Sequence, residues 1–172
     1  MKYDVLFTPL PVYIEEWNGG IFTEFPIYNE IIRDGASVIW VINNISLDYW
    51  IEKAQQDIAS ARDDLAGKRF QNAVSDGYFA CFHALAALLF KEGKTFKKHR
   101  EVRSSLHRDY IKTGKIEPSW GKHYDWLFEN RQKADYSPLV SFESNQVRDV
   151  IEQSSKFVKK IEQLVSTETN QE

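Results

Sequence analysis

The 172-residue sequence holds one cysteine, one methionine and no long run of apolar residues. The single Cys81 excludes a disulfide within the chain, and its place in an apolar segment indicates a small core residue rather than a nucleophile. No stretch approaches the roughly 18 consecutive apolar residues that a membrane span needs. The N-terminus also lacks the successive basic and apolar regions of a signal peptide. We therefore expect a cytoplasmic protein without membrane association.

The composition is that of a folded protein. Hydrophobic residues make up 42% of the chain, charged residues 27% and aromatic residues 14%, which excludes the disordered and fibrous classes. The length suits one ordinary domain with a sizeable core. We expect neither a metal nor a cofactor.

Charge is unevenly distributed along the chain. The net charge is −3, but residues 91–115 contain nine Lys or Arg against three acids, so this window is +6 and the remainder is −9. Such a window either holds phosphates or forms a solvated loop and helix face. On the first interpretation, we predict ligand contacts from Lys94, Lys97, Lys98, His99, Arg100 and Arg103.

Two zones follow one another along the chain. Residues 1–45 are strand-like and turn-rich, with three of the five prolines and three of the eight glycines. This zone is too short to bury a core of its own, so we expect a strand and loop appendage. Residues 46–166 have helical periodicity, and residues 167–172 should be a disordered tail.

The helical zone predicts a mainly α fold, an antiparallel bundle of about five helices with short connections. The expected helices are Ser46 to just before Gly67, Phe70 to Glu92, Arg100 to Thr113, Ser119 to Ala134, and Ser144 to Val165. The second is apolar almost all round, so it should be the most buried element, and we expect it to be too short to span a membrane.

An arginine interrupts the apolar stripe of the fourth helix. The stripe has helical spacing and consists of Trp120, Tyr124, Leu127 and Arg131. Arg131 therefore points inward and needs acceptors, for which Asp135 and Asp76 are candidates. Either it forms a structural ion pair at the helix end, or it belongs to a polar site in a cleft between the second and fourth helices that includes His83. We predict one hydrogen-bonded cluster of Arg131, Asp135 and Tyr136 at a groove.

Four segments between residues 54 and 164 carry a family resemblance: AQQDIASARDDL, FQNAVSDGYFACFHALAALLF, KKHREVRSSLHRDYIKTGKI and NRQKADY. They resemble, in order and spacing, the HEPN family of nucleotide-binding domains, in the branch found beside minimal nucleotidyltransferases. The resemblance implies a homodimer that binds a nucleotide, an RNA or a nucleotidyltransferase partner in a toxin–antitoxin pair.

The catalytic motif of the family is incomplete here. Active HEPN ribonucleases are similar in carrying an arginine and, a few residues later, a histidine, but Arg131 is followed by Asp135 and Tyr136 and by no histidine. Cleavage of RNA needs a base for the 2′-hydroxyl proton and cations for the phosphate. Arg131 suits the second role, whereas a carboxyl with a pKa near 4 such as Asp135 is a poor base. His83 and His99 remain as candidate bases.

The N-terminal zone resembles the end of a nucleotidyltransferase domain. YDVLFTPL and EIIRDGASVIW look like its last catalytic strand and closing elements, with Asp4 at the position of a metal carboxylate. The Gly-Ser turn and the paired aspartates of that family are absent, and nucleotidyl transfer needs those carboxylates to hold magnesium. We therefore expect no transferase activity.

Three functions remain open. The first is a non-catalytic HEPN module that dimerises and binds one of the partners named above. The second is a metal-independent RNA endonuclease with a variant motif, and the third is a purely structural interaction protein. We expect the homodimer to form through the second and fourth helices, because the bundle has more aromatic surface than it can enclose. The aromatic residues concerned are Phe79, Phe82, Phe90, Trp120 and Trp126. The alternative is that all five lie in the core.

Overall fold

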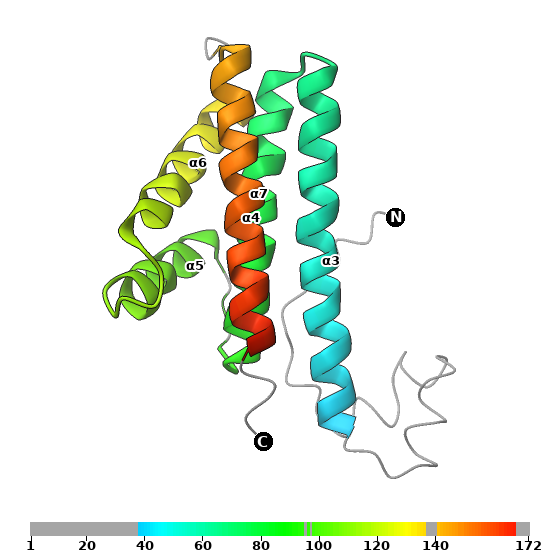
Figure 1. The fold of residues 1–172 in the computed structure, drawn as a ribbon, viewed down its shortest axis with the longest axis vertical. Coiled ribbons are helices and arrows are strands. Elements are labelled where there is room, and N and C mark those ends of the chain that lie inside the picture. The colour runs from blue at the N-terminus through cyan, green and yellow to red at the C-terminus, as the bar shows by residue number, and fades with distance from the viewer. Residues whose placement is uncertain (1–37, 95, 97, 137–140, 168–172) are drawn as a thin grey trace.

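The computed structural model describes residues 38–94, 96, 98–136 and 141–167, and these form a bundle of helices (Figure 1). In chain order the elements are α3 (Val38–Ala66), α4 (Phe70–Lys91), α5 (His99–Ser105), the π-helical turn η2 (Leu106–Ile111), α6 (Pro118–Tyr136) and α7 (Ser144–Thr167). The described ranges contain no strand, so the mainly α class is confirmed. Residues 1–37, most of the expected appendage, and the tail after residue 167 lie outside the described residues.

The central helix is α4, and α3, α6 and α7 all pack against it. Thirteen of its 22 residues are buried, which confirms the prediction that it is the most buried element. The expectation that it is too short to span a membrane was wrong, because its length and composition alone meet that requirement. However, 72% of its apolar window is buried inside the bundle, and this identifies it as a core helix.

The first long helix, α3, starts eight residues earlier than the sequence predicted. It begins at Val38 rather than at Ser46, so the C-terminal end of the strand-like zone is helical. The β-branched residues of this stretch suggested a strand, but propensity is a weak signal and no Gly or Pro interrupts the helix. Its buried face consists of apolar residues at helical spacing, which include Trp50, Ala54, Ile58 and Ala61.

Between α4 and α6 the chain is less regular than predicted. Residues 100–113 were expected to form one helix, but α5 is only seven residues long and continues into η2. Gly93, after α4, and Gly114, after η2, have φ of +67° and +76°, as expected for glycines that end helical segments. The last helices, α6 and α7, lie where the sequence placed them, except that Pro118 is the first residue of α6 rather than the residue before it.

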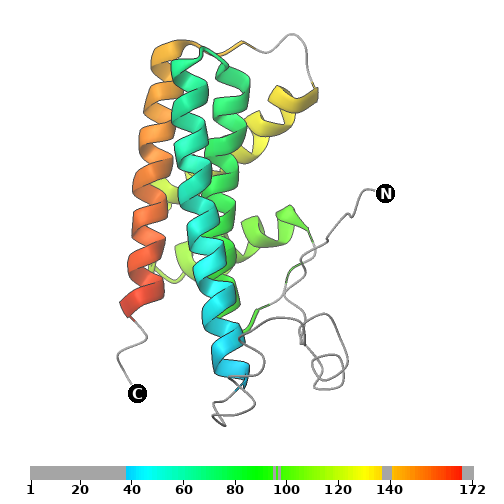
Figure 2. The same cartoon turned by 90° about the vertical axis from the view of Figure 1, so that its right-hand side faces the viewer.

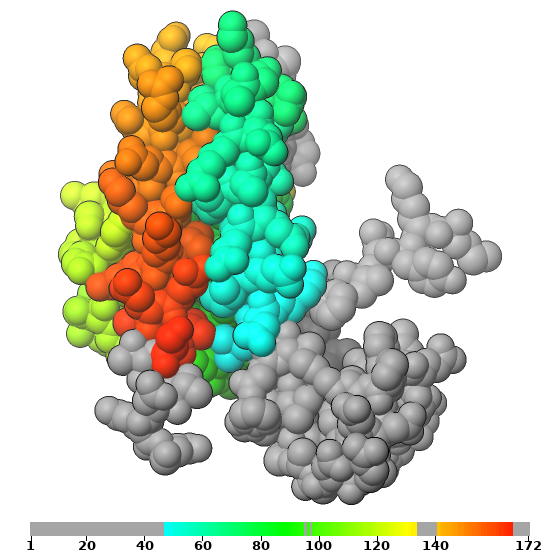
Figure 3. All heavy atoms as spheres, turned by 45° about the vertical axis from the view of Figure 1, so that its right-hand side comes forward, coloured from blue at the N-terminus to red at the C-terminus, as the bar shows by residue number. Residues whose placement is uncertain are grey.

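The three longest helices, α3, α4 and α7, all pack against one another. α3 and α7 lie side by side (Figure 3), and α5 and α6 project from one side of these three helices (Figure 2). α4 and α7 run in the same direction because α6 returns the chain to the end where α4 starts (Figure 1).

The interior contains one polar link between α4, α6 and α7. Ser154 is the one buried polar residue within the described ranges, and its Oγ lies 3.0 Å from His123 Nε2. The Cys81 thiol also bonds to Ser154, and burial raises the pKa of this thiol to about 12. Cys81 is therefore an unreactive core residue, as the sequence indicated.

Candidate functional site

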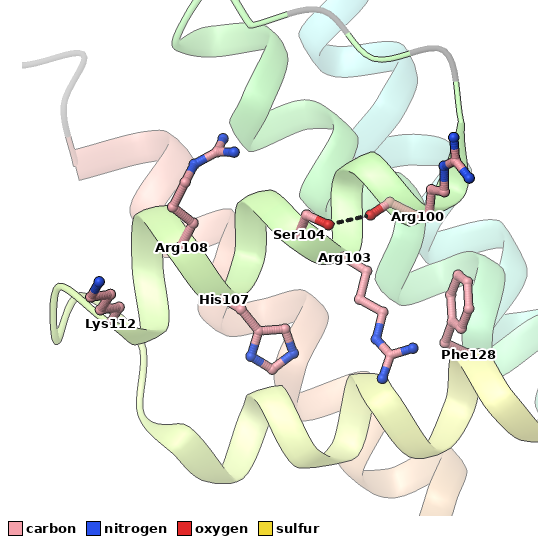
Figure 4. A pocket seen from close by; sticks show the side chains of 7 residues that line it. All are labelled: Arg100, Arg103, Ser104, His107, Arg108, Lys112 and Phe128. Carbon is pink, nitrogen blue, oxygen red and sulfur yellow. Dashed lines mark hydrogen bonds between the residues drawn. The ribbon is translucent and has the colours of Figure 1, made fainter.

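An open groove lies between the α5–η2 segment and α6, with a volume of about 630 Å³. Its lining is shown in Figure 4 and consists of Arg100, Arg103, Ser104, His107, Arg108, Lys112 and Phe128. Six of these seven residues come from the basic window at residues 91–115. The sequence thus located the charged surface, but named only Arg100 and Arg103 within the groove.

Two local features place the α5–η2 segment against α6. Leu106 and Tyr110 of η2 are buried in the core, so the turn presents its other residues outward. Gly121 of α6 lies directly beneath, and a Cβ added there would come within 3.0 Å of His107 Cε1. A larger residue at this position would push the π-helical turn away from α6. Such turns are frequent at functional sites.

The centre of the groove is a charged network that joins α5 and η2 to α6. Arg103 Nε donates to Asp125 Oδ1 at 2.6 Å, and a terminal nitrogen of the same guanidinium reaches Glu129 Oε1 at 3.4 Å. His107 Nε2 lies 2.9 Å from the same Asp125 oxygen. The Arg103 guanidinium carbon is 4.9 Å from the centroid of the Phe128 ring. Two carboxylates therefore balance the positive charge at the centre.

The two ends of the groove are not balanced in this way. Arg100 and Lys112 are exposed, and no carboxylate of the described residues lies within ion-pair distance of either. Arg108 differs, because it pairs with Asp109 at 2.7 Å and points away from His107 and Arg103 in Figure 4. This pairing holds the pKa of Asp109 at about 2. Arg100 and Lys112 are thus the cations most available to an external anion.

The other predicted lysines do not line this groove. Lys94 pairs with Glu92 at 2.6 Å and with Asp109 at 3.0 Å, and the hydrogen bond with Glu92 raises the pKa of Lys94. Lys98 is exposed and precedes α5. Lys97 lies outside the described residues.

His99 belongs to a second cluster, between α4, α5 and α6. Its Nδ1 is 2.8 Å from the Tyr78 hydroxyl, and its ring stacks on Phe82 with 4.3 Å between centroids. Burial, followed by the nearby charges of Arg131 and His83, lowers the pKa of His99. His99 is therefore neutral at pH 7 and able to take up a proton.

Arg131 lies in the same cluster, half-buried, as the stripe predicted. Its guanidinium carbon is 5.0 Å from the Phe79 ring centroid and 5.7 Å from that of Tyr78. Its stripe neighbours Tyr124 and Leu127 are fully buried, which confirms the inward direction. Asp135 and Tyr136 are in α6, but their side chains lie outside the described part, so the predicted cluster with Arg131 stays a prediction.

His83 and Asp76 are associated with α3. His83 Nδ1 is 2.6 Å from Asp57 Oδ2, and its ring contacts those of Trp50 and Phe79. Burial and the charges of two α3 aspartates raise the pKa of Asp76 to about 6. Neither residue lines the groove, and Asp57 rather than Asp76 is the carboxylate beside His83. Within the described residues, no group of three or more His, Cys, Asp or Glu is placed to hold a metal ion.

Sequence reasoning missed five of the seven lining residues and the two carboxylates that pair with Arg103: Ser104, His107, Arg108, Lys112, Phe128, Asp125 and Glu129. A signal was available for the first three, because positions 100, 103, 104, 107 and 108 share one helical face. The α6 residues had no comparable signal, since their role depends on how α6 packs against η2.

Comparison with known proteins supplies a family match. Residues 47–164 match the HEPN domain family. A UPF0332 protein of Thermotoga maritima is 36% identical over 119 residues, which is 69% of this chain and 90% of that protein. Two proteins of Methanocaldococcus jannaschii are named "Putative toxin MJ0605" and "Putative toxin MJ0142". They are 29% and 24% identical, over 64% and 66% of this chain and 82% and 78% of their own lengths.

Proposed function

The chain belongs to the HEPN domain family, and from that premise we propose that it is a cytoplasmic RNA-binding module of a toxin–antitoxin-like system. The toxin names of two relatives support the biological context. The observation that carries the proposal is the groove between α5–η2 and α6, with Arg100 and Lys112 exposed at its ends. Such cations gain by replacing the counterions of a phosphate backbone.

The basic groove favours RNA over a purely structural role. A solvated helix face typically has its charges paired along the same helix, whereas here the paired charges cross from α5–η2 to α6 and leave Arg100 and Lys112 open. Arg103, stacked on Phe128, adds a planar group of the kind that RNA-binding surfaces use.

The test is the affinity for a fluorescent eight-nucleotide single-stranded RNA, measured by anisotropy between 50 and 200 mM salt. We expect the affinity to fall with salt, and the double variant Arg100→Ala, Lys112→Ala to reduce the slope of log affinity against log salt by about 1.4, at ~0.7 per phosphate contact. The matched control is Lys122→Ala, Lys159→Ala, which removes the same charge from exposed positions outside the groove. Equal behaviour of the two double variants would reject the proposal.

A second candidate function is RNA cleavage without a metal. It is favoured by the neutral His99 beside the Arg131 cation, since one side chain can accept the 2′-hydroxyl proton while the other stabilises the phosphate. Cleavage in EDTA should disappear in both His99→Gln and Arg131→Ala. Thermal melts must show that both variants fold, because removing a half-buried arginine also costs stability. Absence of cleavage by the wild-type protein would leave RNA binding alone.

The proposal includes two protein partners. A second copy of the chain would pack on α4 and α6, where Phe79, Trp120 and Trp126 are only partly buried. A nucleotidyltransferase partner follows from the resemblance of the motifs to the nucleotidyltransferase-associated branch. If neither RNA binding nor cleavage is found, these contacts would define a structural interaction protein.

A further inference from the structure

The centre of the groove is poorly suited to a phosphate. Asp125 and Glu129 lie on its α6 side, and both contact Arg103. A phosphate placed there would meet two carboxylates, whereas at Arg100 or Lys112 it would meet cations alone. The groove therefore has cationic ends and a centre whose charge is already balanced, and the centre suits a neutral group.

Arg103 provides a fixed flat surface at this centre. Its Nε and one terminal nitrogen are held by Asp125 and Glu129, so the guanidinium plane has a defined orientation. Phe128 supports the guanidinium at 4.9 Å and is itself braced by the Tyr78 ring at 6.0 Å. Figure 4 shows Arg103 extending between His107 and Phe128. A planar cation held on an aromatic ring is a stacking surface for a nucleobase.

Glu129 provides hydrogen-bond acceptors next to that surface. Its contact with Arg103 is long, at 3.4 Å, and its side chain is 59% exposed, so the carboxylate keeps acceptor capacity beside the Arg103 guanidinium. A carboxylate accepts two parallel N–H bonds best. Among the RNA bases, guanine offers two adjacent N–H donors on its Watson–Crick edge, while uracil offers one.

We propose that the centre of the groove seats one unpaired RNA base, guanine in preference to uracil, stacked on Arg103 and bonded to Glu129. Phosphates of the same strand on either side of this nucleotide lie at Arg100 and Lys112, the exposed cations at the two ends of the groove. This inference rests on the proposed function and specifies its substrate as single-stranded RNA with a guanine.

The experiment compares a uridine octamer with the same octamer carrying one central guanine. We expect the guanine octamer to bind about tenfold more tightly, the lower end of what one bidentate base contact supplies. Glu129→Gln should reduce this preference to less than twofold, and the uridine octamer should then bind more tightly because a negative charge is removed. Annealing the guanine octamer to its complement should also abolish the preference, because the edge of the base becomes occupied.

The outcomes separate this inference from the function on which it rests. If both octamers bind equally and both lose affinity in Arg100→Ala, Lys112→Ala, the groove binds RNA but the base site is wrong. If that double variant changes nothing, the proposed function fails as well. Persistence of the guanine preference in Glu129→Gln would also overturn the base site. Glu143→Gln, which removes an exposed carboxylate outside the groove, is the matched control.

Discussion

His123 is a histidine that the bundle holds in its neutral form. Its ring is largely buried against Ser154, and this burial lowers its pKa from 6.5 to about 4. The unfolded chain therefore takes up a proton between these two values while the folded protein does not. The contribution of His123 to the free energy of unfolding is therefore fully present above about pH 6.5. It is lost as the pH falls toward 4.

This linkage predicts that acid weakens the fold in part through His123. Between pH 7.5 and pH 5 the contribution of His123 to the free energy of unfolding should fall by about 2 kcal/mol. In His123→Gln, which has no titratable group, the loss measured by urea unfolding should be smaller by that amount. Asp76 acts in the opposite sense, because its raised pKa favours the protonated form in the folded state. Identical pH dependence of variant and wild type would contradict the prediction.

At the residue scale, the sequence predicted which way a side chain points better than it predicted which residues that side chain contacts. The spacing of Tyr124, Leu127 and Arg131 placed the arginine inward, because helical periodicity alone determines which face a residue occupies. It did not predict that the rings of Tyr78 and Phe79 flank the guanidinium, since those contacts depend on how α6 crosses α4.

At the element scale, α6 can approach η2 closely because the residue of α6 at the contact is a glycine, Gly121. Gly121 lies under His107, so the substitution Gly121→Leu would crowd the side chains of His107 and Ile111 in η2. We expect the free energy of unfolding to fall by about 1–3 kcal/mol, the usual cost of overpacking. RNA affinity should fall too, because Arg103 would move relative to Asp125. Urea unfolding and anisotropy measure the two effects.

The neighbouring position supplies the control for Gly121. Lys122 is exposed on the same helix, and Lys122→Leu adds a similar side chain without any contact to η2. That variant should unfold at nearly the wild-type urea concentration. If it is destabilised as much as Gly121→Leu, the effect belongs to α6 itself and not to its contact with η2.

Four of the five expected helices could be located from the sequence. The remaining one, expected at residues 100–113, is a short α-helix followed by a π-helical turn. Apolar periodicity and the Gly and Pro residues near the helix ends fixed α4, α6, α7 and the end of α3. The π-helical register of residues 106–111 left no mark in the sequence, because Leu106 and Tyr110 are four positions apart and would share one buried face in an ordinary α-helix too. The groove between η2 and α6 was unpredictable because it depends on how α6 packs against η2.

At the scale of the whole molecule, the expected homodimer stays a prediction. Of the five aromatic residues that motivated it, Phe82 is buried and the other four are partly buried against the core. The bundle therefore encloses more of this surface than the sequence suggested. The surface left for a partner lies on α4 and α6.

Light scattering measures the assembly directly. A chain of 20.1 kDa should give about twice that mass at micromolar concentration if α4 and α6 pair across a two-fold axis. Phe79→Glu should restore the monomer mass, with circular dichroism confirming that the helices persist. Tyr49→Glu is the control, because Tyr49 is 43% exposed but belongs to α3. A monomer mass for the wild type would exclude the dimer.

The difference in packing between the three long helices and the α5–η2 segment also has a consequence for amide hydrogen exchange. α3, α4 and α7 contact one another, whereas η2 is held chiefly by α5 and α6. Residues 99–111 should therefore open by local unfolding well before these three helices do. RNA at 100 times its dissociation constant should slow amide exchange in this segment by about a hundredfold. The amides of α4, which exchange only when the whole protein unfolds, should still exchange most slowly. Amide exchange in residues 99–111 would therefore show whether RNA is bound in the groove.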